Sequence, residues 1–295
     1  MKRLFVFILF CTTELAGQTS YFITSFDGTK LFVNEFGKGQ PLILLAGGPG
    51  LDAIYIKSIW ERLQSNYRCI VPDQRATGKS ELKNIDTVSA SVDAYAKDLE
   101  ALRQHLKLDQ LTLIGHSWGG MLSMDYASKY PNRVKRLILI GSGGPTGKFF
   151  GYFEDNITMR LHEEDLKEMA ELEAMKKPVL KGYWPGYFFD RKKALEIKNA
   201  TDFEEIMDNP AVIPLVFTNY IATEKLRIAR LKKFRGLVSI IQGRQDPIGE
   251  STVQEIHELL PQSQIHIIEK CGHLPWWENE EQVKLFFETL IKCLQ

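Results

Sequence analysis

The sequence has little that would mark a binder of nucleic acid or metal ions. Its 37 lysine and arginine residues are balanced by 37 aspartate and glutamate residues, so it lacks the basic excess that contacts to a phosphate backbone require. Only 4 of its 295 residues are cysteine, and no pair of cysteines has the spacing of metal ligands. It has no internal repeat and no low-complexity tract. We therefore predict no nucleic-acid partner and no metal.

The N-terminus has the pattern of a secretory signal. Lys2 and Arg3 precede an apolar run at residues 4–10, which is far shorter than the roughly 20 apolar residues that span a bilayer. We therefore predict a signal peptide over residues 1–18, no membrane span, and an exported protein, either periplasmic or secreted. The alternatives are a buried N-terminal strand in a cytoplasmic protein and a lipid-modified Cys11.

The remaining cysteines are predicted to be structural. Removal of the signal peptide would leave Cys69, Cys271 and Cys293, so at least one of them is unpaired or pairs between chains. We expect these side chains to be buried as small apolar groups.

The chain contains enough apolar material for a packed core. Hydrophobic residues make up 44% of it and aromatic residues 11%, which excludes disorder for the bulk of the chain. Its length is typical of one large or two ordinary domains. Segments 21–26 and 30–36 are predicted strands around a turn at Asp27-Gly28. Other apolar runs suit strands buried on both faces of a parallel sheet; these are 42–45, 70–71, 111–114, 137–140, 237–241 and 265–268.

Helical patterns alternate with these runs. Apolar residues spaced by three and four positions over 92–106 form one face of a helix. A second helix is expected from Trp118 to just before Pro131, a third ends before Pro261, and the last has Asn279 as its N-cap. This alternation predicts an α/β fold with a mostly parallel sheet and helices on both faces.

The segment from 145 to 235 interrupts the alternation. It has no clear buried strand, is helix-like and rich in charge, and contains an aromatic cluster at residues 183–189. We predict that residues 145–235 are a helical cap inserted over the sheet. Residues 19–144 and 236–295 are then the α/β core.

The strongest local signal for chemistry is Gly115-His116-Ser117-Trp118-Gly119-Gly120. It lies between the predicted strand 111–114 and a predicted helix, which is the setting of a nucleophile elbow. There the serine occupies a tight turn, and side chains two residues before and after it would clash. The start of the helix also offers free N–H groups to a developing oxyanion. We therefore predict that Ser117 is a nucleophile; the alternative is a tight turn with an incidental serine.

A serine hydroxyl needs a base, which in turn needs an orienting acid. Of the six histidines, His273 alone lies in a loop after a predicted strand, at the edge where α/β sites form. His116 is expected to point to the other side of the elbow. The rest fall on helical patterns or inside a strand; they are His105, His162, His257 and His266. We therefore predict that His273 is the base.

The acid is expected in the loop after the run 237–241, because hydrolases with this elbow have the chain order serine, acid, histidine. Asp246 lies in that loop, between Ser117 and His273 in sequence. The alternative for Asp246 is a turn-forming residue before Pro247, and Glu250 is the reserve candidate for the acid.

A glycine-rich segment, Ala46-Gly47-Gly48-Pro49-Gly50, follows the run 42–45. Glycines let a backbone approach a ligand closely. The N–H groups of Gly48 and Trp118 are predicted to form an oxyanion hole, and a plain glycine-rich turn is the alternative. The segment lacks the Gly-Lys-Ser/Thr ending of a phosphate loop.

Together these segments resemble the α/β-hydrolase superfamily over essentially the whole chain after the predicted signal peptide, and within it the proline iminopeptidase group. Three signatures of that group are matched in order and spacing: residues 47–50, Asp73-Gln74-Arg75 with Gly78 and Ser80, and residues 115–120. The resemblance implies an α/β-hydrolase fold with a helical cap and a serine hydrolase that needs no cofactor. It also implies release of an N-terminal residue, often proline, from peptides.

The sequence departs from that group at positions that bear on specificity. Ala46 and Ala76 stand where the group usually has His and Gly. The segment 145–235 has no clear counterpart of the cap glutamates that hold the ammonium group of the substrate in family aminopeptidases. The glutamates available there also suit a solvated helix face; they are Glu163, Glu164, Glu204 and Glu205. Trp184 is a candidate substrate-binding residue in an apolar pocket, with a place in the core of the cap as its alternative.

The favoured function is a serine hydrolase that forms an acyl-enzyme, with Ser117, His273 and Asp246 as its catalytic residues. We expect a proline iminopeptidase-like aminopeptidase acting on a small molecule or short peptide. A carboxylesterase or lactonase of the same fold is the alternative, and a non-catalytic binding protein that keeps the pocket is a third hypothesis. A serine at the elbow argues against dehalogenases and epoxide hydrolases of this fold, which use an aspartate.

Overall fold

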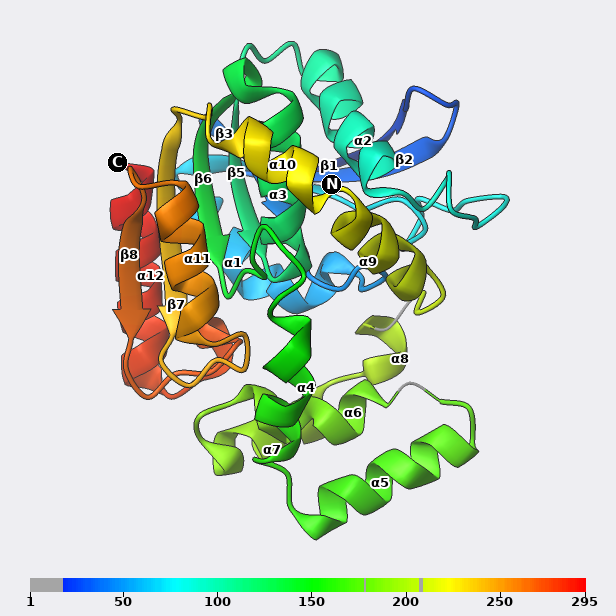
Figure 1. The fold of residues 1–295 in the computed structure, drawn as a ribbon, viewed down its shortest axis with the longest axis vertical. Helices are drawn as coiled ribbons and strands as arrows, with labels where there is room; N and C mark the ends of the chain where they lie inside the picture. Colours follow the sequence, from blue (N-terminus) through cyan, green and yellow to red (C-terminus); the bar gives the residue numbers. More distant parts are fainter. Residues whose placement is uncertain (1–17, 178, 207–208) are drawn as a thin grey trace, which may run out of the picture.

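The fold is built around one sheet (Figure 1). The computed structural model describes residues 18–177, 179–206 and 209–295. These residues contain a sheet of eight strands; they are β1 (Gln18–Thr24), β2 (Lys30–Phe36), β3 (Gln40–Leu45), β4 (Tyr67–Pro72), β5 (Leu111–His116), β6 (Val134–Ile140), β7 (Leu237–Gly243) and β8 (Gln264–Ile268).

The sheet is mostly parallel. Its strand order is β1–β2–β4–β3–β5–β6–β7–β8. β2 runs antiparallel to both of its neighbours, and every other neighbouring pair is parallel. The predicted mostly parallel sheet is therefore confirmed, and the parallel strands end along one edge of it.

The first strand begins earlier than predicted. β1 starts at Gln18, which pairs with Phe36 of β2. The predicted signal peptide over residues 1–18 therefore ends inside β1 at its last residue, and the rest of it, with Cys11, lies outside the described residues. In the part of the chain that is described, no helix is both long and apolar enough to cross a membrane.

Helices cover both faces of the sheet because its buried strands carry apolar side chains on both sides. Leu42 and Leu44 pack with residues of α1 (Lys57–Leu63) and α12 (Glu280–Leu294). Ile43 and Leu45, which point the other way along β3, pack with residues of α2 (Val92–His105), α3 (Trp118–Lys129) and α11 (Glu250–Leu259). The chain thus buries two apolar cores, one on each face.

The segment between β6 and β7 is helical in its described part. Its elements are α4 (Phe150–Thr158), α5 (Glu163–Ala174), α6 (Leu180–Tyr183), the 3-10 turn η3 (Trp184–Tyr187), α7 (Arg191–Ala200), α8 (Phe203–Ile206), α9 (Val212–Ala222) and α10 (Glu224–Leu231).

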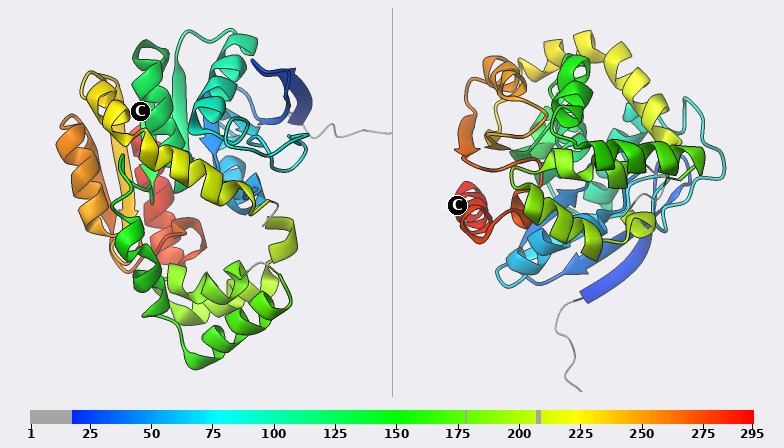
Figure 2. Two further views of the ribbon diagram at one scale, coloured as in Figure 1. Left: turned by 45° about the vertical axis from the view of Figure 1, so that its right-hand side comes forward. Right: turned by 90° about the horizontal axis from the view of Figure 1, so that it is seen from below.

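These helices lie in two places. Figures 1 and 2 show α4 to α8 beyond the edge of the sheet where β7 and β8 end, whereas α9 and α10 lie alongside α2 and α3. The Asn219 side chain of α9 accepts a hydrogen bond from the N–H of Val92 at 3.0 Å. Arg227 of α10 is paired with Asp125 of α3 at 3.3 Å, and both side chains are buried. The last two helices therefore pack as part of the α/β layers.

Two predictions are confirmed, and one helix was not predicted. Asn279 is the N-cap residue of α12, as predicted, although its side-chain amide donates to Asp190, the N-cap residue of α7, at 3.0 Å and forms no capping hydrogen bond. Helix α1 was not predicted, because a helix of seven residues is too short to show a clear hydrophobic period. Three cysteines are free and buried, as expected; they are Cys69, Cys271 and Cys293.

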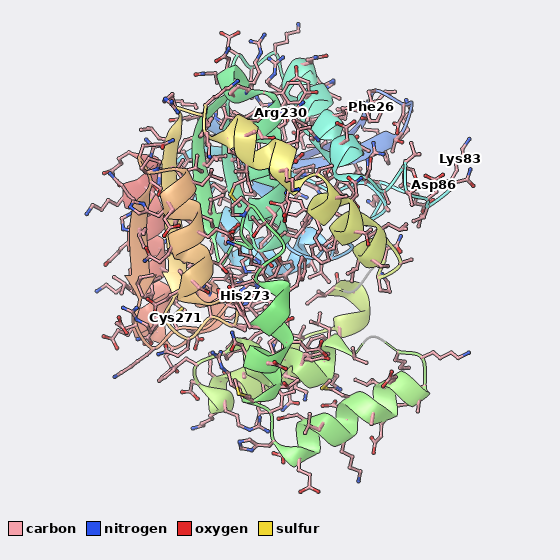
Figure 3. The ribbon with its side chains drawn as sticks, viewed as in Figure 1. Phe26, Lys83, Asp86, Arg230, Cys271 and His273 are labelled. Carbon is pink, nitrogen blue, oxygen red and sulfur yellow. The ribbon has the colours of Figure 1, made fainter. Side chains whose placement is uncertain are left out.

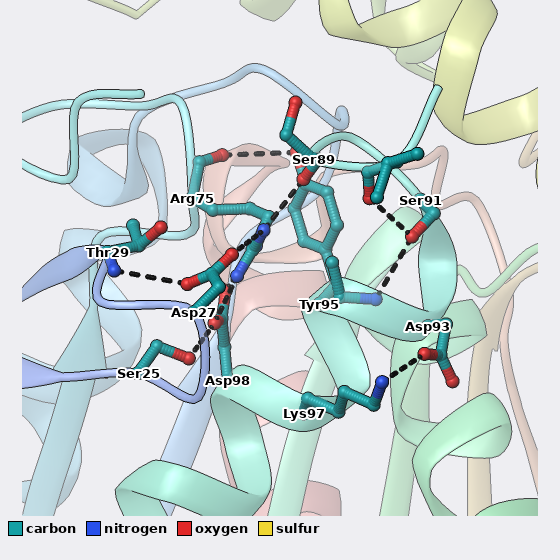
Figure 4. A network of polar contacts seen from close by, with 12 residues as sticks. Ser25, Asp27, Thr29, Arg75, Ser89, Ser91, Asp93, Tyr95, Lys97 and Asp98 are labelled. Atoms are coloured by element: carbon teal, nitrogen blue, oxygen red, sulfur yellow. Dashed lines mark hydrogen bonds and ion pairs between the residues drawn. The ribbon is translucent and has the colours of Figure 1, made fainter. Parts of the chain in front are cut away.

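A buried arginine joins three segments on the side of the sheet near β1 (Figure 4). Arg75 is fully buried and donates from Nε and Nη2 to the two carboxylate oxygens of Asp98 on α2, each at 2.6 Å. Its Nη1 donates to Asp27 in the β1–β2 turn at 3.2 Å and to the Ser89 carbonyl oxygen at 2.7 Å. Ser25 also donates a hydrogen bond to Asp98. The network holds the β1–β2 turn and the loop after β4 against α2.

We expect Asp98→Ala to lower the free energy of unfolding by about 3–5 kcal/mol, because it leaves the Arg75 charge buried without its main partner. The matched control is Asp93→Ala on the same helix. Asp93 is half exposed and pairs with Lys97 and Lys129, so its loss is expected to change stability by less than about 1 kcal/mol. Urea unfolding measures both values, and equal losses would contradict a structural role for the network.

Candidate active site

The candidate nucleophile lies on a strained turn. Ser117 follows β5 directly, has φ of 52°, and is followed by the first residue of α3. This backbone conformation is uncommon for a residue other than glycine. A Cβ on Gly115 would lie 2.3 Å from the Gly119 carbonyl oxygen, and one on Gly119 would lie 2.3 Å from the Leu45 carbonyl oxygen. The glycines on both sides of Ser117 therefore allow the turn to close.

The candidate base and acid are in contact. His273 lies in the loop after β8, and Asp246 lies in the loop after β7. The Nδ1 atom of His273 is 2.9 Å from Oδ2 and 3.0 Å from Oδ1 of Asp246, and both residues are buried. Oδ1 also accepts the Ile248 N–H at 2.8 Å, which fixes the carboxylate. Figure 3 shows His273 at the junction between the core and α4.

The reserve acid lies elsewhere. Glu250 is the first residue of α11 and forms an ion pair with Arg244 at 2.5 Å. Its side chain is 44% exposed, whereas the carboxylate of Asp246 is enclosed beside His273. The geometry therefore favours Asp246 over Glu250 as the partner of the imidazole.

The serine and the histidine open into the same cavity. Ser117 and His273 both line a cavity of about 220 Å³, and no hydrogen bond joins them within the described chain. Such contacts are often loose before a substrate binds and tighten in the complex. The structure thus brings Asp246 and His273 into direct contact and places Ser117 on the wall that His273 shares.

The two predicted oxyanion donors face the same cavity. Gly48 and Trp118 both line it. Trp118 is the first residue of α3, so its N–H has no acceptor within the helix, and the Gly48 N–H has no backbone acceptor among the described residues. Gln74 connects their segments: it donates to the Ala46 carbonyl oxygen and accepts from the Trp118 indole, each at 2.9 Å.

The cavity is apolar. The side chains on its wall are aromatic or aliphatic apart from Ser117 and two histidines, and no aspartate, glutamate, lysine or arginine of the described chain lines it. The apolar and aromatic lining residues are Leu51, Tyr55, Trp118, Met121, Phe149, Phe150, Phe153, Leu180, Trp184, Tyr187, Ile206, Ile213, Phe217, Ile248 and Leu274. A neutral, apolar group is the kind of ligand that such a wall accommodates.

Trp184 lies on the cavity wall and is packed among other aromatic rings. It lines the cavity and is also buried, being 3% exposed. Its ring packs against Phe203 at a centroid distance of 5.0 Å and against Trp277 at 5.5 Å. Its indole nitrogen is buried and has no hydrogen-bond partner in the described chain. Trp184 is therefore a buried residue of the segment 145–235, and its ring also forms part of the cavity wall.

The loop that carries His273 is fastened to the segment around η3. The N–H of His273 donates to the Tyr187 carbonyl oxygen at 2.7 Å. Oε1 of Glu278 accepts from the N–H groups of Gly272 and Phe189, at 2.7 and 2.9 Å. Burial raises the pKa of this carboxyl group. A Cβ on Gly272 would lie 2.1 Å from the Tyr187 carbonyl oxygen, so glycine permits the close approach.

His116 lies beside His273, where the sequence analysis did not expect it. The predicted direction of its side chain, to the other side of the elbow, was wrong. The two imidazole rings are 4.5 Å apart between centroids, and both line the cavity. Burial, and next the proximity of His273, lower the pKa of His116 well below its usual range. His116 is the residue just before Ser117, so its backbone position was known but its side-chain direction was not.

Three other residues near the site escaped the sequence analysis in different ways. Tyr55 lies in the short turn η1 (Ala53–Ile56), and nothing in its local pattern indicates a role. Glu278 follows two tryptophans and has the appearance of a surface charge. Gln74 lies within the recognised signature at residues 73–80, and this signature was the sequence feature that could have identified it.

The comparisons with known proteins agree with this architecture. The model of the alpha/beta hydrolase fold family matches residues 40–169. A 2-hydroxy-6-oxo-6-phenylhexa-2,4-dienoate hydrolase of Burkholderia cepacia is 26% identical over 288 residues, 91% of this chain and 95% of that protein.

Two shorter matches are closer in identity. A cis-3-alkyl-4-alkyloxetan-2-one decarboxylase of Shewanella oneidensis is 36% identical over 119 residues, 40% of this chain. A proline iminopeptidase of Lactobacillus helveticus is 38% identical over 109 residues, 36% of this chain. Each of these two matches spans only 37% of the relative's own length.

Solved structures of the same fold cover nearly the whole chain. A proline iminopeptidase-related protein of Thermus thermophilus has a TM-score of 0.73 at 20% identity, covering 94% of this chain and 98% of that one. An esterase of Exiguobacterium antarcticum has a TM-score of 0.68 at 23% identity, covering 93% and 98%. At these identities the likeness concerns the fold.

The sheet order, the elbow and these matches together define the class: the chain has the α/β-hydrolase fold. It is a serine hydrolase, since a serine occupies the elbow and the relative that aligns over nearly the whole chain is a hydrolase.

Proposed function

We propose that this serine hydrolase cleaves neutral carboxylic esters whose groups are apolar. The observation that carries the proposal is the uncharged wall of the cavity beside Ser117. An aminopeptidase has to hold the free ammonium group of its substrate, and burial of an ammonium without a counter-charge is strongly unfavourable. The same argument applies to a substrate carboxylate, because no arginine or lysine of the described chain lines the cavity.

The acidic residues considered for ammonium binding are placed elsewhere. Asp246 is occupied by His273 and by the Ile248 N–H. Glu164 is exposed on α5 and pairs with Arg191 at 2.8 Å. Neither Glu163 nor Glu205 lines the cavity, and the side chain of Glu204 lies outside the described residues. The described site therefore offers no carboxylate to a substrate amine.

The chemistry proceeds through an acyl-enzyme. Ser117 Oγ attacks the ester carbonyl carbon while His273 Nε2 takes the hydroxyl proton, and Asp246 stabilises the imidazolium through Nδ1. The N–H groups of Gly48 and Trp118 hold the oxyanion. The C–O bond to the alcohol breaks, and His273 gives its proton to the departing alcohol. Water then attacks the acyl group, His273 takes its proton, and Ser117 is released with a proton as the carboxylic acid leaves.

In this proposal the segment 145–235 acts as the cap of the site, and its part from α4 to α8 forms the roof. Nine residues of the segment line the cavity: Phe149, Phe150, Phe153, Leu180, Trp184, Tyr187, Ile206, Ile213 and Phe217. Residues 19–144 and 236–295 supply Ser117, Asp246 and His273. The core thus carries the reacting groups, and the cap supplies apolar surface that selects the substrate.

The second candidate function is an aminopeptidase of the proline iminopeptidase type. It is supported by the 38% identity over 109 residues to the Lactobacillus helveticus enzyme and by the sequence signatures at residues 47–50, 73–80 and 115–120. The two candidates share Ser117, His273 and Asp246 and differ in what holds the substrate.

Two esters with one leaving group separate the candidates: 4-nitrophenyl propanoate and the 4-nitrophenyl ester of alanine, which adds an ammonium group. After division by the uncatalysed rates, we expect kcat/KM to favour the propanoate by about 100-fold, equivalent to roughly 3 kcal/mol of unfavourable ammonium burial. We also expect 4-nitrophenyl hemisuccinate to have a lower kcat/KM than 4-nitrophenyl butanoate, because it adds a carboxylate that the cavity wall leaves without a counter-charge. Preference for the alanine ester, together with turnover of prolyl-4-nitroanilide, would instead establish the aminopeptidase.

A cap variant serves as a control. Glu164→Gln is expected to leave the kcat/KM of both esters unchanged, since Glu164 pairs with Arg191 away from the cavity. Selective loss of activity toward the alanine ester in this variant would contradict the proposal, because it would assign ammonium binding to the cap.

A further inference from the structure

We propose that Tyr55 and His116 are positioning residues. Their side chains form one hydrogen-bond chain from the glycine-rich loop that carries Gly48 to the backbone of His273. The proposal rests on the serine hydrolase chemistry described above and assigns these two side chains no reacting role. The chain runs from the Gly47 N–H to the Tyr55 hydroxyl, on to Nδ1 of His116, and from Nε2 of His116 to the carbonyl oxygen of His273.

The direction of every bond in this chain follows from its two ends. The Gly47 N–H is able only to donate, so the Tyr55 oxygen accepts there. The His273 carbonyl oxygen is able only to accept, so His116 Nε2, 2.9 Å away, carries a hydrogen. Nδ1 of a neutral ring is then an acceptor, and the Tyr55 hydroxyl donates to it at 2.8 Å. The chain therefore requires neutral His116 with its hydrogen on Nε2.

The surroundings keep His116 in that state. Tyr55, His116 and Trp276 are all buried, and burial lowers the pKa of His116 and raises that of Tyr55. The His116 ring packs edge-on against Trp276 at 4.8 Å. Trp276 in turn donates from its indole nitrogen to the Tyr55 carbonyl oxygen at 3.0 Å. Water has little access to the chain, so a broken link would leave a buried polar group without a partner.

The chain spans three segments that meet at the reacting groups. Gly47 precedes the oxyanion donor Gly48, and a Cβ on Gly47 would lie 2.6 Å from the Tyr55 hydroxyl and 3.1 Å from Cβ of Ser117. His116 ends β5 immediately before Ser117. His273 is the base, and its carbonyl oxygen is the terminal acceptor. Oxyanion hole, nucleophile and base are therefore linked by one row of fixed donors and acceptors, in addition to the backbone.

The test is a double-mutant cycle with Tyr55→Phe, His116→Leu and the double variant. The readouts are kcat/KM for the best ester and the second-order rate of Ser117 labelling by a fluorophosphonate. We expect losses of about 10-fold and about 100-fold in the singles, since displacement of a catalytic group by about 1 Å lowers rates by about 100-fold. The double variant is expected to be within about 3-fold of His116→Leu, because both changes break the same chain.

Conservative replacements separate positioning from simple packing. Glutamine places its amide nitrogen near the former Nε2 and keeps the donor to His273, whereas asparagine places its oxygen near the former Nδ1 and keeps only the acceptor for Tyr55. We therefore expect His116→Gln to recover most of the activity and His116→Asn to resemble His116→Leu. Thermal unfolding of each variant sets an assay temperature at which all of them are folded.

The outcomes are distinct. The proposed hydrogen-bond chain would be overturned if the two losses multiply in the double variant, or if His116→Gln and His116→Asn are equally active. If the protein turns over no neutral ester but the labelling rates are non-additive in the double variant, the hydrogen-bond chain is retained and the proposed substrate class is refuted.

Discussion

Replacement of Ser117 by alanine is expected to lower kcat by about a million-fold, the size of the loss when the nucleophile of a serine triad is removed. Ser117 lies on the strained turn between β5 and α3 and lines the same cavity as His273. A residual rate above that in water is expected, because the N–H groups of Gly48 and Trp118 remain in place. Turnover of a 4-nitrophenyl ester measures the loss, and fluorophosphonate labelling of the protein should disappear with it.

A second serine of α3 provides the control. Ser128 is buried near the end of the helix and donates to the Asp125 carbonyl oxygen at 2.7 Å. It does not line the cavity. Ser128→Ala is expected to keep both turnover and labelling at the wild-type level. Activity of Ser117→Ala within about 10-fold of the wild type would rule out the acyl-enzyme mechanism.

Asp246→Asn is expected to lower kcat by about 10,000-fold while leaving the fold intact. The carboxylate accepts the hydrogen on Nδ1 of His273 at 2.9 Å and so keeps Nε2 free to take the proton of Ser117. An amide in its place presents an N–H to Nδ1, which favours the opposite tautomer with its hydrogen on Nε2. That tautomer is unable to act as the base.

Glu250→Gln is the matched control for this prediction. Glu250 lies in the same part of the chain and carries the same charge, but it faces Arg244 at the surface. We expect its kcat to equal that of the wild type. Equal losses in Asp246→Asn and Glu250→Gln would indicate that electrostatics over a longer range, and not the tautomer, controls the rate.

Much of the architecture could be predicted because the strands are buried on both faces. Runs such as 42–45 and 137–140 are apolar without interruption, and they became part of β3 and β6. The positions of Ser117, Asp246 and His273 follow from the same fact, since each lies just after a strand. Parallel strands end at one edge, so residues far apart in sequence were expected to converge there.

The parts that escaped prediction depend on contacts between distant segments. The charge-rich pattern of residues 145–235 did not reveal that α9 and α10 pack beside α2 and α3. The pairing of Arg75 with Asp98 joins residues 23 positions apart, and neither has a local pattern that indicates burial. The side-chain direction of His116 is set by Tyr55 and Trp276, which come from two other segments.

The substrate class illustrates the same limit. The sequence signatures favoured an aminopeptidase, because signatures report the elbow and the loops around it. The apolar cavity is assembled from side chains spread between Gly47 and Leu274, and its lack of charge in the described chain becomes visible only when these are brought together. The serine hydrolase class was therefore predictable from short segments, whereas the lack of charge on the cavity wall was not.

The hydrogen bond from the His273 N–H to the Tyr187 carbonyl oxygen, with Glu278 bridging Gly272 and Phe189, has a consequence for protein engineering. Replacing the roof segment of this protein by that of a relative would also replace Tyr187, whose carbonyl oxygen accepts the hydrogen bond from the His273 N–H. Chimaeras made to broaden selectivity would then lose turnover even on the original substrates, unless the residues that replace Tyr187 and Phe189 offer the same backbone partners. An exchange of this segment would thus change the selectivity and the rate of the enzyme together.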